Sequence, residues 1–388
     1  MDDHLLTSPP ASGLPPAALP TGEPDDAVLQ PVFTGSGQEY FRIWIVNLML
    51  TVATLGIYSA WAKVRRLQYF DRNTQLGGAV FDFRGNPIAI LRGRLAAAVM
   101  LGAYHYAFGF STAVALTIVG TLALMLPYLL RGAIRFRLQN TRYRGVAFSF
   151  TGSVPGAYSV FVPFIVLFVG PAVLVALDPT GKTVALVGLL YLCFPYLYGR
   201  LKAYQHGHAT YGAAPSSYDV SPWRFYRYYF VAFGLGLLGS IVVGIGAAVL
   251  IPLFKSFLDG HPAFAGLALI GGAAAGYLGF LLLIPYMAVR TANLVWSHTT
   301  FPGIEIRSTM SARAFARLQV VNVVLTLLTL GLFRPFAVVR THRFRLAAMT
   351  VVASAGFEGA LAKAADEHTG EGASGDGAAD FFGFDLSL

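Results

Sequence analysis

The sequence has few charged residues. Only 12% of its 388 residues are Asp, Glu, Lys or Arg, whereas 55% are hydrophobic, and the mean hydropathy is +0.60. Soluble domains carry about twice that charged fraction. These values exclude an ordinary water-soluble globular protein and predict a membrane protein whose chain crosses the bilayer several times.

Cysteine and acidic residues are scarce in the apolar segments. The single cysteine, Cys193, lies inside an apolar run, which excludes a disulfide within one chain and a thiolate metal site. No Asp or Glu lies within the predicted spans, so the sequence gives no support to a proton or sodium relay through carboxylates. No set of acid, base and nucleophile occurs together. We therefore expect no enzyme, no catalytic residues, no cofactor and no bound metal.

The positive charge follows the apolar segments. The net charge is +9, and clusters of Lys and Arg come directly after apolar runs. This arrangement is typical of the cytoplasmic border of a membrane protein. We therefore expect the lipid bilayer and its anionic headgroups as partners, together with a possible small solute, and no nucleic acid.

One stretch, residues 39–85, organises the chain. It joins an apolar run, residues 43–62, to a basic segment and then to Val80-Phe81-Asp82-Phe83, whose alternation is typical of a strand. Residues 43–55 alone are too short to cross the bilayer. Two such runs carry matching polar residues before a Leu-Gly pair: Asn47, Thr51 and Thr54 in the first, and Asn322, Thr326 and Thr329 in the second. We predict that both are short, Gly-broken, re-entrant segments and that they pack against each other.

A similar connector follows each of five apolar runs. Every connector has an aromatic residue at the end of the run, then an arginine, and then a threonine about ten residues later. The arginines are Arg65, Arg131, Arg200, Arg290 and Arg340, and the threonines are Thr74, Thr141, Thr210, Thr299 and Thr350. Because arginine suits bidentate binding of phosphate, these five arginines are candidates for binding an anion or a lipid headgroup. Their alternative role is to border the membrane.

The predicted fold is an all-α polytopic membrane protein. It has about six transmembrane helices in hairpins, the two re-entrant segments, and small cytoplasmic β-hairpins in about five pseudo-repeats. Residues 1–30 form a disordered Pro-rich tail, residues 31–352 the membrane domain, and residues 353–388 an acidic Gly-rich disordered tail. Counting Lys and Arg on each side favours cytoplasmic connectors and cytoplasmic termini.

Several of these residues resemble a known family. The segments Glu39–Asn47, Thr54–Arg66 and Gly85-Asn86-Pro87 are similar to those of the YjgN family of bacterial inner-membrane proteins. The resemblance covers residues 32–352 and leaves both tails outside. It implies a multi-pass protein of the bacterial inner (plasma) membrane. It implies no established activity and no functional residues.

Two functional hypotheses remain from the sequence. The first is a transporter or channel for a small or anionic solute, because paired hairpins and broken segments occur in transporters. The second is a lipid-binding or envelope-organising protein without transport or catalysis. The polar residues of the two broken segments are candidate functional groups. His105, between Tyr104 and Tyr106, is a further candidate because it is an ionisable residue inside a predicted span.

Overall fold

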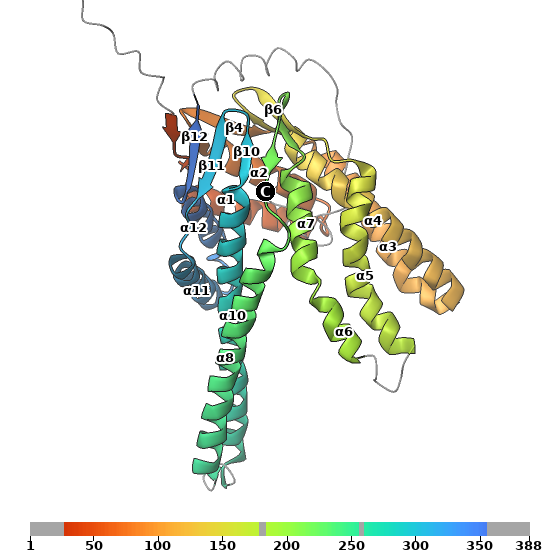
Figure 1. The fold of residues 1–388 in the computed structure, drawn as a ribbon, viewed down its shortest axis with the longest axis vertical. Coiled ribbons are helices and arrows are strands. Elements are labelled where there is room, and N and C mark those ends of the chain that lie inside the picture. Colours follow the sequence, from red (N-terminus) through yellow and green to blue (C-terminus); the bar gives the residue numbers. More distant parts are fainter. Residues whose placement is uncertain (1–26, 178–183, 256–259, 355–388) are drawn as a thin grey trace, which may run out of the picture.

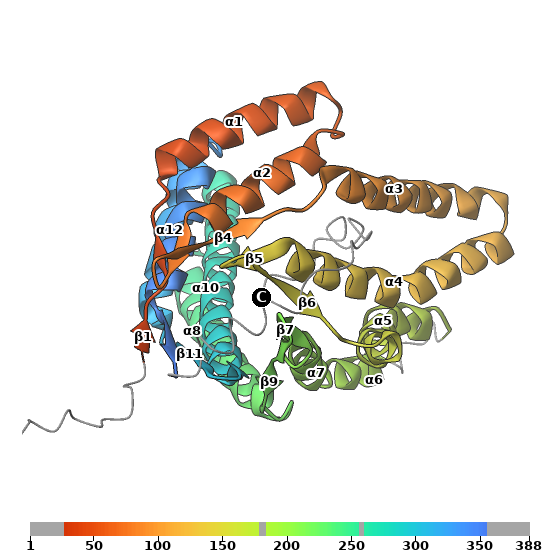
Figure 2. The same ribbon diagram turned by 90° about the horizontal axis from the view of Figure 1, so that it is seen from above.

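The computed structural model describes residues 27–177, 184–255 and 260–354. Strands gather at one end of the molecule, and helices extend away from them as five arms (Figure 1). Seen from above, the arms surround a common centre (Figure 2). The arms are α1 (Gly37–Ala53) with α2 (Ser59–Arg72), α3 (Pro87–Phe110) with α4 (Thr112–Asn140), α5 (Val154–Leu177) with α6 (Val184–Tyr191) and α7 (Phe194–His206), α8 (Arg224–Leu253) with α10 (Pro262–Trp296), and α11 (Ala312–Leu328) with α12 (Arg334–Ala347).

The strands form two antiparallel sheets. One has the order β1 (Ala27–Leu29), β12 (Met349–Ala353), β11 (Ile304–Ser308), β10 (Thr299–Phe301) and β9 (Ser217–Tyr218). The other has the order β2 (Val32–Phe33), β3 (Thr74–Leu76), β4 (Ala79–Phe83), β5 (Thr141–Tyr143), β6 (Val146–Phe150), β7 (Ala209–Tyr211) and β8 (Ala214–Pro215). The chain passes directly from β1 to β2 and from β8 to β9. The two sheets therefore adjoin at both ends, and we call the whole assembly the strand ring.

Side chains from both sheets meet in one core inside the strand ring. Tyr143 and Tyr211 of the second sheet are buried together with Ala353 of the first. The Tyr143 hydroxyl donates to the carbonyl of Leu76 (2.8 Å), and the Tyr211 hydroxyl donates to the carbonyl of Tyr143 (3.0 Å). These bonds tie β3, β5 and β7 into one unit.

The strand ring corrects the expectation of an all-α protein with small, separate β-hairpins. Strand pairs from different connectors bond to each other, as in the pairing of Phe81 with Tyr143 and of Phe148 with Tyr211. A two-stranded hairpin alone is marginally stable and leaves two unpaired edges. Pairing successive hairpins fills those edges, so the connectors assemble into continuous sheets.

The connector threonines lie at the junctions between helices and strands. Thr74, Thr141 and Thr299 each begin a strand, and each hydroxyl donates to the carbonyl four residues earlier, in the last turn of the preceding helix. These bonds satisfy carbonyls that the helix end leaves without an intrahelical partner. The recurring threonine therefore marks where each of these helices stops.

Four helices of the described residues are long and apolar enough to cross a membrane. They contain the candidate spans Pro87–Tyr106, Ala113–Asn140, Val154–Pro171 and Arg224–Leu253. The most apolar window of the last span has no buried residue, so its side chains face outward. Contiguous apolar surface of this size marks a surface for lipid or protein contact. The chain is therefore a membrane protein, with fewer identified spans than the six predicted.

The two short arms have the same local geometry. In α1–α2, Leu55 and Gly56 turn the chain with φ values of 50° and 93°, and in α11–α12 Leu330 and Gly331 have values of 51° and 93°. Positive φ costs energy for leucine but not for glycine. The backbone conformation of the turn therefore explains the glycine of each Leu-Gly pair but not the leucine. Both arms return to the strand ring because their first helices follow strands and their second helices precede them.

A threonine connects the two helices across each turn. The Thr54 hydroxyl donates to the carbonyl of Leu50 (2.7 Å) and accepts from the backbone N–H of Tyr58 (2.9 Å). Thr329 bonds in the same way to Leu325 and Phe333. The threonines therefore satisfy backbone groups released at the break.

We predict that Thr54→Val lowers the free energy of unfolding by about 1 kcal/mol, because the mutant loses a helix cap. The matched control is Thr51→Val. The Thr51 hydroxyl donates only to the carbonyl of Asn47 within the same helix, so this change is expected to have a smaller effect. Thermal unfolding in one detergent, followed by circular dichroism, compares the two variants. Equal losses would contradict a capping role for Thr54.

The two ends of the described chain lie together. β1 pairs with β12 along its whole length, and α1 packs against α12, where the rings of Phe41 and Phe336 stack at 5.6 Å. β1 lies within residues 1–30, which the sequence predicts to be a disordered tail. Pairing with β12 orders this strand. Residues 1–26 and 355–388 of the two predicted tails lie outside the described residues.

The two broken segments pack against each other as predicted, but through α1 and α12 and not through the two helices that carry the asparagines. α12 lies against both α1 and α11, so it separates the helix of Asn47 from the helix of Asn322. The Asn322 amide donates to Thr341 Oγ1 (3.2 Å) and to the carbonyl of Ala337 (3.4 Å), both in α12. Asn322 therefore fastens the two helices of its own arm.

Candidate functional site

The five predicted arginines do not form one site among the described contacts. Arg65, Arg290 and Arg340 are exposed, and each guanidinium lies over an aromatic ring of its own helix surface. The distances to the ring centroids are 5.8 Å to Tyr58, 5.6 Å to Tyr286 and 5.9 Å to Phe333. These three side chains belong to the outer surface of the helices.

The other two arginines hold neighbouring segments together. Arg131 Nε donates to the carbonyl of Gly152 (2.6 Å), which links α4 to the segment before α5. Arg200 Nη2 donates to Ser159 Oγ (3.4 Å), which links α7 to α5. Their contacts are structural, so they do not point to a shared ligand.

The predicted polar residues are also spread over the molecule. Asn47 and Asn322 are buried, Thr51 and Thr326 bond to the carbonyls of these asparagines, and Thr54 and Thr329 lie at the turns. His105 is exposed on α3, and its ring lies 5.2 Å from the ring of neighbouring Tyr106. The structure therefore does not bring the asparagines, the threonines and His105 together in one place.

A different group of basic residues lies close together. We call Lys63 and Arg66 of α2, Arg94 of α3 and Arg137 of α4 the basic cluster. Lys63 lies on the same helical face as buried Ala60 and Leu67, because residues three and four apart are neighbours on a helix. Arg94 Nη1 donates to the hydroxyl of Ser59 in α2.

An apolar core fixes the helices that carry the basic cluster. Ala60, Val64, Leu67, Phe83, Ile90 and Phe136 pack together where α2, β4, α3 and α4 meet. Arg94 follows buried Ile90 by one helical turn, and Arg137 follows buried Phe136 directly. The Arg137 guanidinium also lies over the ring of Phe83, 6.0 Å from its centroid. Arg94 therefore lies at the N-terminal end of α2, beside Ser59, and Arg137 lies near its C-terminal end, beside Asp71, while Lys63 and Arg66 lie between them on α2.

Burial and mutual repulsion perturb Lys63. Burial, together with the nearby guanidinium groups of Arg94, Arg137 and Arg66, lowers its pKa to about 7. α2 has 14 residues and is not one of the candidate spans. A lysine with this pKa is only partly protonated near neutral pH, so its charge responds to a nearby anion.

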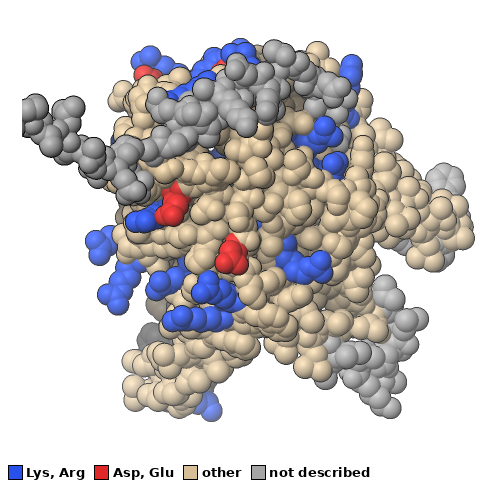
Figure 3. All heavy atoms as spheres, turned by 45° about the horizontal axis from the view of Figure 1, so that its top comes forward, with Lys and Arg blue, Asp and Glu red and all other residues tan. Residues whose placement is uncertain are grey.

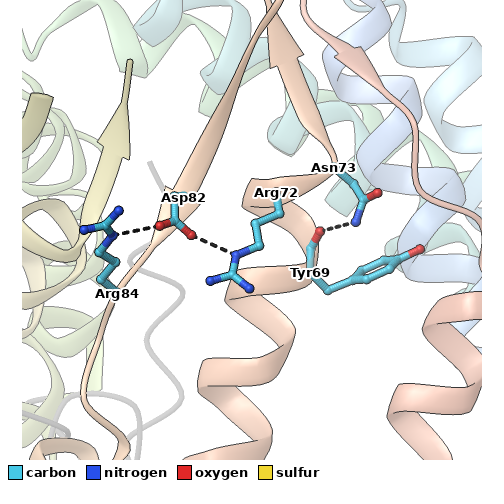
Figure 4. A network of polar contacts seen from close by, with 5 residues as sticks. All are labelled: Tyr69, Arg72, Asn73, Asp82 and Arg84. Atoms are coloured by element: carbon cyan, nitrogen blue, oxygen red, sulfur yellow. Dashed lines mark hydrogen bonds and ion pairs between the residues drawn. The ribbon is translucent and has the colours of Figure 1, made fainter. Parts of the chain in front are cut away.

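One carboxylate faces the basic cluster from α2. Asp71 lies 3.9 Å from Arg137, and burial raises the Asp71 pKa to about 6 despite that guanidinium. Asp82 is the other carboxylate nearby, and it bonds to Arg72 (2.8 Å) and Arg84 (2.9 Å) (Figure 4). Hydrogen bonds from Arg84 and Arg72 keep the pKa of Asp82 below its usual value. Asp71 therefore faces the basic cluster, whereas Asp82 bonds to two arginines outside it.

Two histidines near the strand ring are held neutral by burial. His342 of α12 lies 3.3 Å from Thr74 Oγ1, and burial together with nearby guanidinium groups lowers its pKa to about 4. His206 lies 3.0 Å from Thr299 Oγ1, and burial lowers its pKa to about 3. They therefore add no positive charge at neutral pH.

We predict that Lys63→Met raises the free energy of unfolding at pH 7 and below, where the folded protein must otherwise bury a charged ammonium. Because the folded pKa of Lys63 is depressed, the unfolded state binds more protons between about pH 7 and 10.5. The gain over wild type should therefore shrink as pH rises through that range. Thermal unfolding at pH 6, 7.5 and 9 measures it, with Lys255→Met, at an exposed position, as control. A gain independent of pH would contradict the predicted charge effect.

Comparison with known proteins places the chain in a family. A family model described as "Bacterial protein of unknown function (DUF898)" matches residues 29–381. The chain belongs to this family. The match begins near β1 and runs past residue 352, so the family extends further into the C-terminal segment than the sequence resemblance predicted.

Curated relatives agree with the predicted resemblance. "Inner membrane protein YjgN" of Salmonella typhimurium is 29% identical over 174 residues, which are 41% of this chain and 43% of the relative. Proteins of the same name from Escherichia coli O157:H7 and K12 are 29% and 30% identical over 142 residues, 34% of each chain. The matches thus cover less than half the length of these relatives. No solved structure is significantly similar to the chain.

Proposed function

We propose that this chain is a multi-pass protein of the bacterial inner membrane that binds a small anionic solute at the basic cluster and carries or conducts it across the bilayer. The relatives named as inner membrane proteins support the location. The observation that carries the proposal is the row of Lys63, Arg66, Arg94 and Arg137 along α2, beside the core that α2, α3 and α4 share.

The position of the basic cluster suits a solute site. Arg94 and Arg137 belong to the candidate spans of α3 and α4, near the end where both helices meet the strand ring. Partly buried cations need a compensating anion, because removing charges from water is costly. Guanidinium groups also match the geometry of phosphate and carboxylate oxygens. An anion bound there would lie at one end of the spanning helices.

We further propose that the strand ring faces the cytoplasm. In Figure 3, which brings the strand end forward, basic side chains far outnumber acidic ones on the visible face. Lys255 lies instead two residues beyond Leu253, where α8 ends, and this end of α8 is the one far from the strands (Figure 1). This asymmetry supports the positive-inside arrangement, with six spans and both termini on the cytoplasmic side.

The tips of the two short arms support re-entry into the bilayer. Leu55 and Leu330 are each 95% exposed and have positive φ values. In water, a position of this kind favours glycine or asparagine, since leucine there combines backbone strain with exposed apolar surface. Hydrocarbon around the tips would offset both costs. The matching geometry of the two arms also supports the predicted internal repeats.

Purified protein in lipid nanodiscs tests the proposed solute site. Inorganic phosphate, sulfate and succinate, each at matched ionic strength, are titrated by isothermal calorimetry. We expect at least one to bind with a saturable signal and to accumulate in proteoliposomes that contain the protein. Absence of saturable binding by all three would contradict an anion site of this chemistry.

The outer arginines favour a second function, the binding of anionic lipid headgroups. The guanidinium groups of Arg65, Arg290 and Arg340 each lie over an aromatic ring at the exposed helix surface. Basic and aromatic residues gather in this way at the membrane interface. Native mass spectrometry of protein in mixed phosphatidylglycerol and phosphatidylcholine would show selective retention of the anionic lipid. Equal retention of both lipids would argue against this second function.

A further inference from the structure

Two carboxylates lie where α2 meets the strand ring, and their contacts differ. Both oxygens of Asp82 accept a hydrogen bond, one from Arg72 (2.8 Å) and one from Arg84 (2.9 Å) (Figure 4). Asp71 is more deeply buried, with 13% of its side chain exposed against 26% for Asp82. No residue of the described chain donates a hydrogen bond to Asp71 Oδ2. Because a buried polar atom without a partner is costly, the ionised form of Asp71 is poorly compensated, whereas that of Asp82 is bonded at both oxygens.

Arg137 of the basic cluster is the cation that faces Asp71. Its Nη2 lies 3.9 Å from Asp71 Oδ1, which is too long for a hydrogen bond, and its guanidinium also lies over the ring of Phe83. Asp82 of β4 acts on Asp71 as a like charge. Other charged or titratable groups on the elements around α2 lie elsewhere: Arg42 of α1 and Arg92 of α3 are exposed, and Glu39, Arg94 and His342 contact Tyr69, Ser59 and Thr74. Asp71 is therefore the carboxylate that an anion at Arg137 would meet.

Charge beside Arg137 acts directly on Asp71. An anion there replaces Asp71 as the counterion of Arg137 and brings a like charge close to the carboxylate, which favours the protonated form of Asp71. We propose that Asp71 is a proton-binding site of the basic cluster. It is ionised and paired with Arg137 when the cluster is empty, and it takes a proton from water when an anion binds. The second of these states rests on the proposed function, because it requires the anion site.

The ionisation of Asp71 supports this assignment. Burial raises the pKa of Asp71 to about 6, against the opposing effect of Arg137. An anion raises this pKa further, so the occupied site binds more protons than the empty site, and the affinity for the anion increases as the pH falls towards 6. Asp71 lies on α2, outside the candidate spans. The scarcity of carboxylates in the spans therefore does not exclude proton coupling.

Infrared spectroscopy of the full chain in nanodiscs tests the proton site without any solute. Spectra at pH 5 and 7.5 differ in the C=O stretch of the carboxyl groups that lose a proton between these values. We expect Asp71→Asn to remove one component of this difference, with a midpoint near pH 6. Asparagine has the shape of a protonated aspartate, so this variant should fold normally, as circular dichroism will show. Asp219→Asn, at an exposed position, is the control and should retain the component. An unchanged difference in Asp71→Asn would overturn the proton site.

Calorimetric titration with sulfate tests the coupling. Sulfate does not titrate near neutral pH, so buffers of different ionisation heat report only the protons that the protein binds. At pH 6 we expect wild type to take up about half a proton for each sulfate. Asp71→Asn should take up at most about 0.1, which is the share left to Lys63 with its pKa of about 7. At pH 7.5 this variant should bind sulfate about 10-fold more tightly than wild type, because it resembles the protonated state. Asp219→Asn should match wild type in both measurements.

The two measurements separate this inference from the proposed function. Saturable sulfate binding with equal proton uptake by wild type and Asp71→Asn would retain the anion site and overturn the coupling. The infrared component of Asp71 without saturable sulfate binding would reject the anion site, and the coupling with it, while retaining Asp71 as a proton site.

Discussion

Replacing Lys63 and Arg94 together with glutamine is expected to weaken the binding of inorganic phosphate about 100-fold. Hydrogen bonds to charged groups contribute about 1.5–3 kcal/mol each, and two of them account for a loss of about two factors of ten. Glutamine keeps a polar, hydrogen-bonding side chain in both positions, so the change removes the charge and shortens the reach. Calorimetric titration of the two proteins in nanodiscs, at one ionic strength, measures the loss.

The outer arginines supply the matched control for this result. Arg65→Gln lies in the same helix as Lys63, and its side chain faces the ring of Tyr58 on the outer surface. Together with Arg340→Gln it should change phosphate affinity less than about 3-fold, because exposed charges act through solvent and salt. A larger loss from the outer pair than from the inner pair would show that the basic cluster is not the anion site.

Replacing Leu55 and Leu330 with aspartate is expected to destabilise the protein in lipid by about 3 kcal/mol for each change. Inserting Asp in place of an apolar residue at the centre of a membrane segment costs about that much. The direction of the change in stability distinguishes tips in lipid from tips in water. If the tips were in water, aspartate would tolerate the positive φ better than leucine and would be neutral or stabilising.

Unfolding of these variants in nanodiscs measures the position of the tips. Asparagine tolerates positive φ as aspartate does but has no charge. Leu55→Asn should therefore lose less stability than Leu55→Asp. Val80→Asp, on an exposed position of β4, is the control for a new aspartate in the strand ring. A loss at Val80 equal to that at Leu55 would contradict insertion of the tips.

Local patterns in the sequence predicted the elements well. The break at Leu55-Gly56, its counterpart at Leu330-Gly331 and the threonines that end the helices all rest on contacts within a few residues. The strand ring could not be predicted in this way. Its strands have two to five residues, and neighbours such as Phe83 and Thr141 are far apart in the chain. Their pairing depends on how the arms are arranged, which no short pattern records.

The basic cluster was missed for a related reason. The recurring motif selects the first arginine after each aromatic residue, and in α2 that is exposed Arg65. Whether a basic side chain of α2 is exposed depends instead on the face of the helix that it occupies. Ala60, Val64 and Leu67 mark the buried side, and Lys63 lies on that side. That spacing was visible in the sequence, but its meaning depended on knowing that α3 and α4 cover this face.

β1 was missed because it is ordered only by its partner. Ala27–Leu29 follow a Pro- and Asp-rich stretch and are too short to give a strand signal. They pair with Val351–Ala353 at the other end of the domain. Asn322, by contrast, bonds within its own arm, to Thr341 of the helix that follows it.

The sidedness of the strand ring tests the account most directly. Cys193 is exposed and is replaced with alanine, and single cysteines are introduced at Arg144, Glu305 and Lys255. A membrane-impermeant maleimide is applied to cells whose outer membrane has been opened. The account predicts that Lys255→Cys is labelled at once, and that Arg144→Cys and Glu305→Cys are labelled only after the inner membrane is permeabilised. Labelling of either strand-ring cysteine before permeabilisation would contradict a ring that lies wholly on the cytoplasmic side.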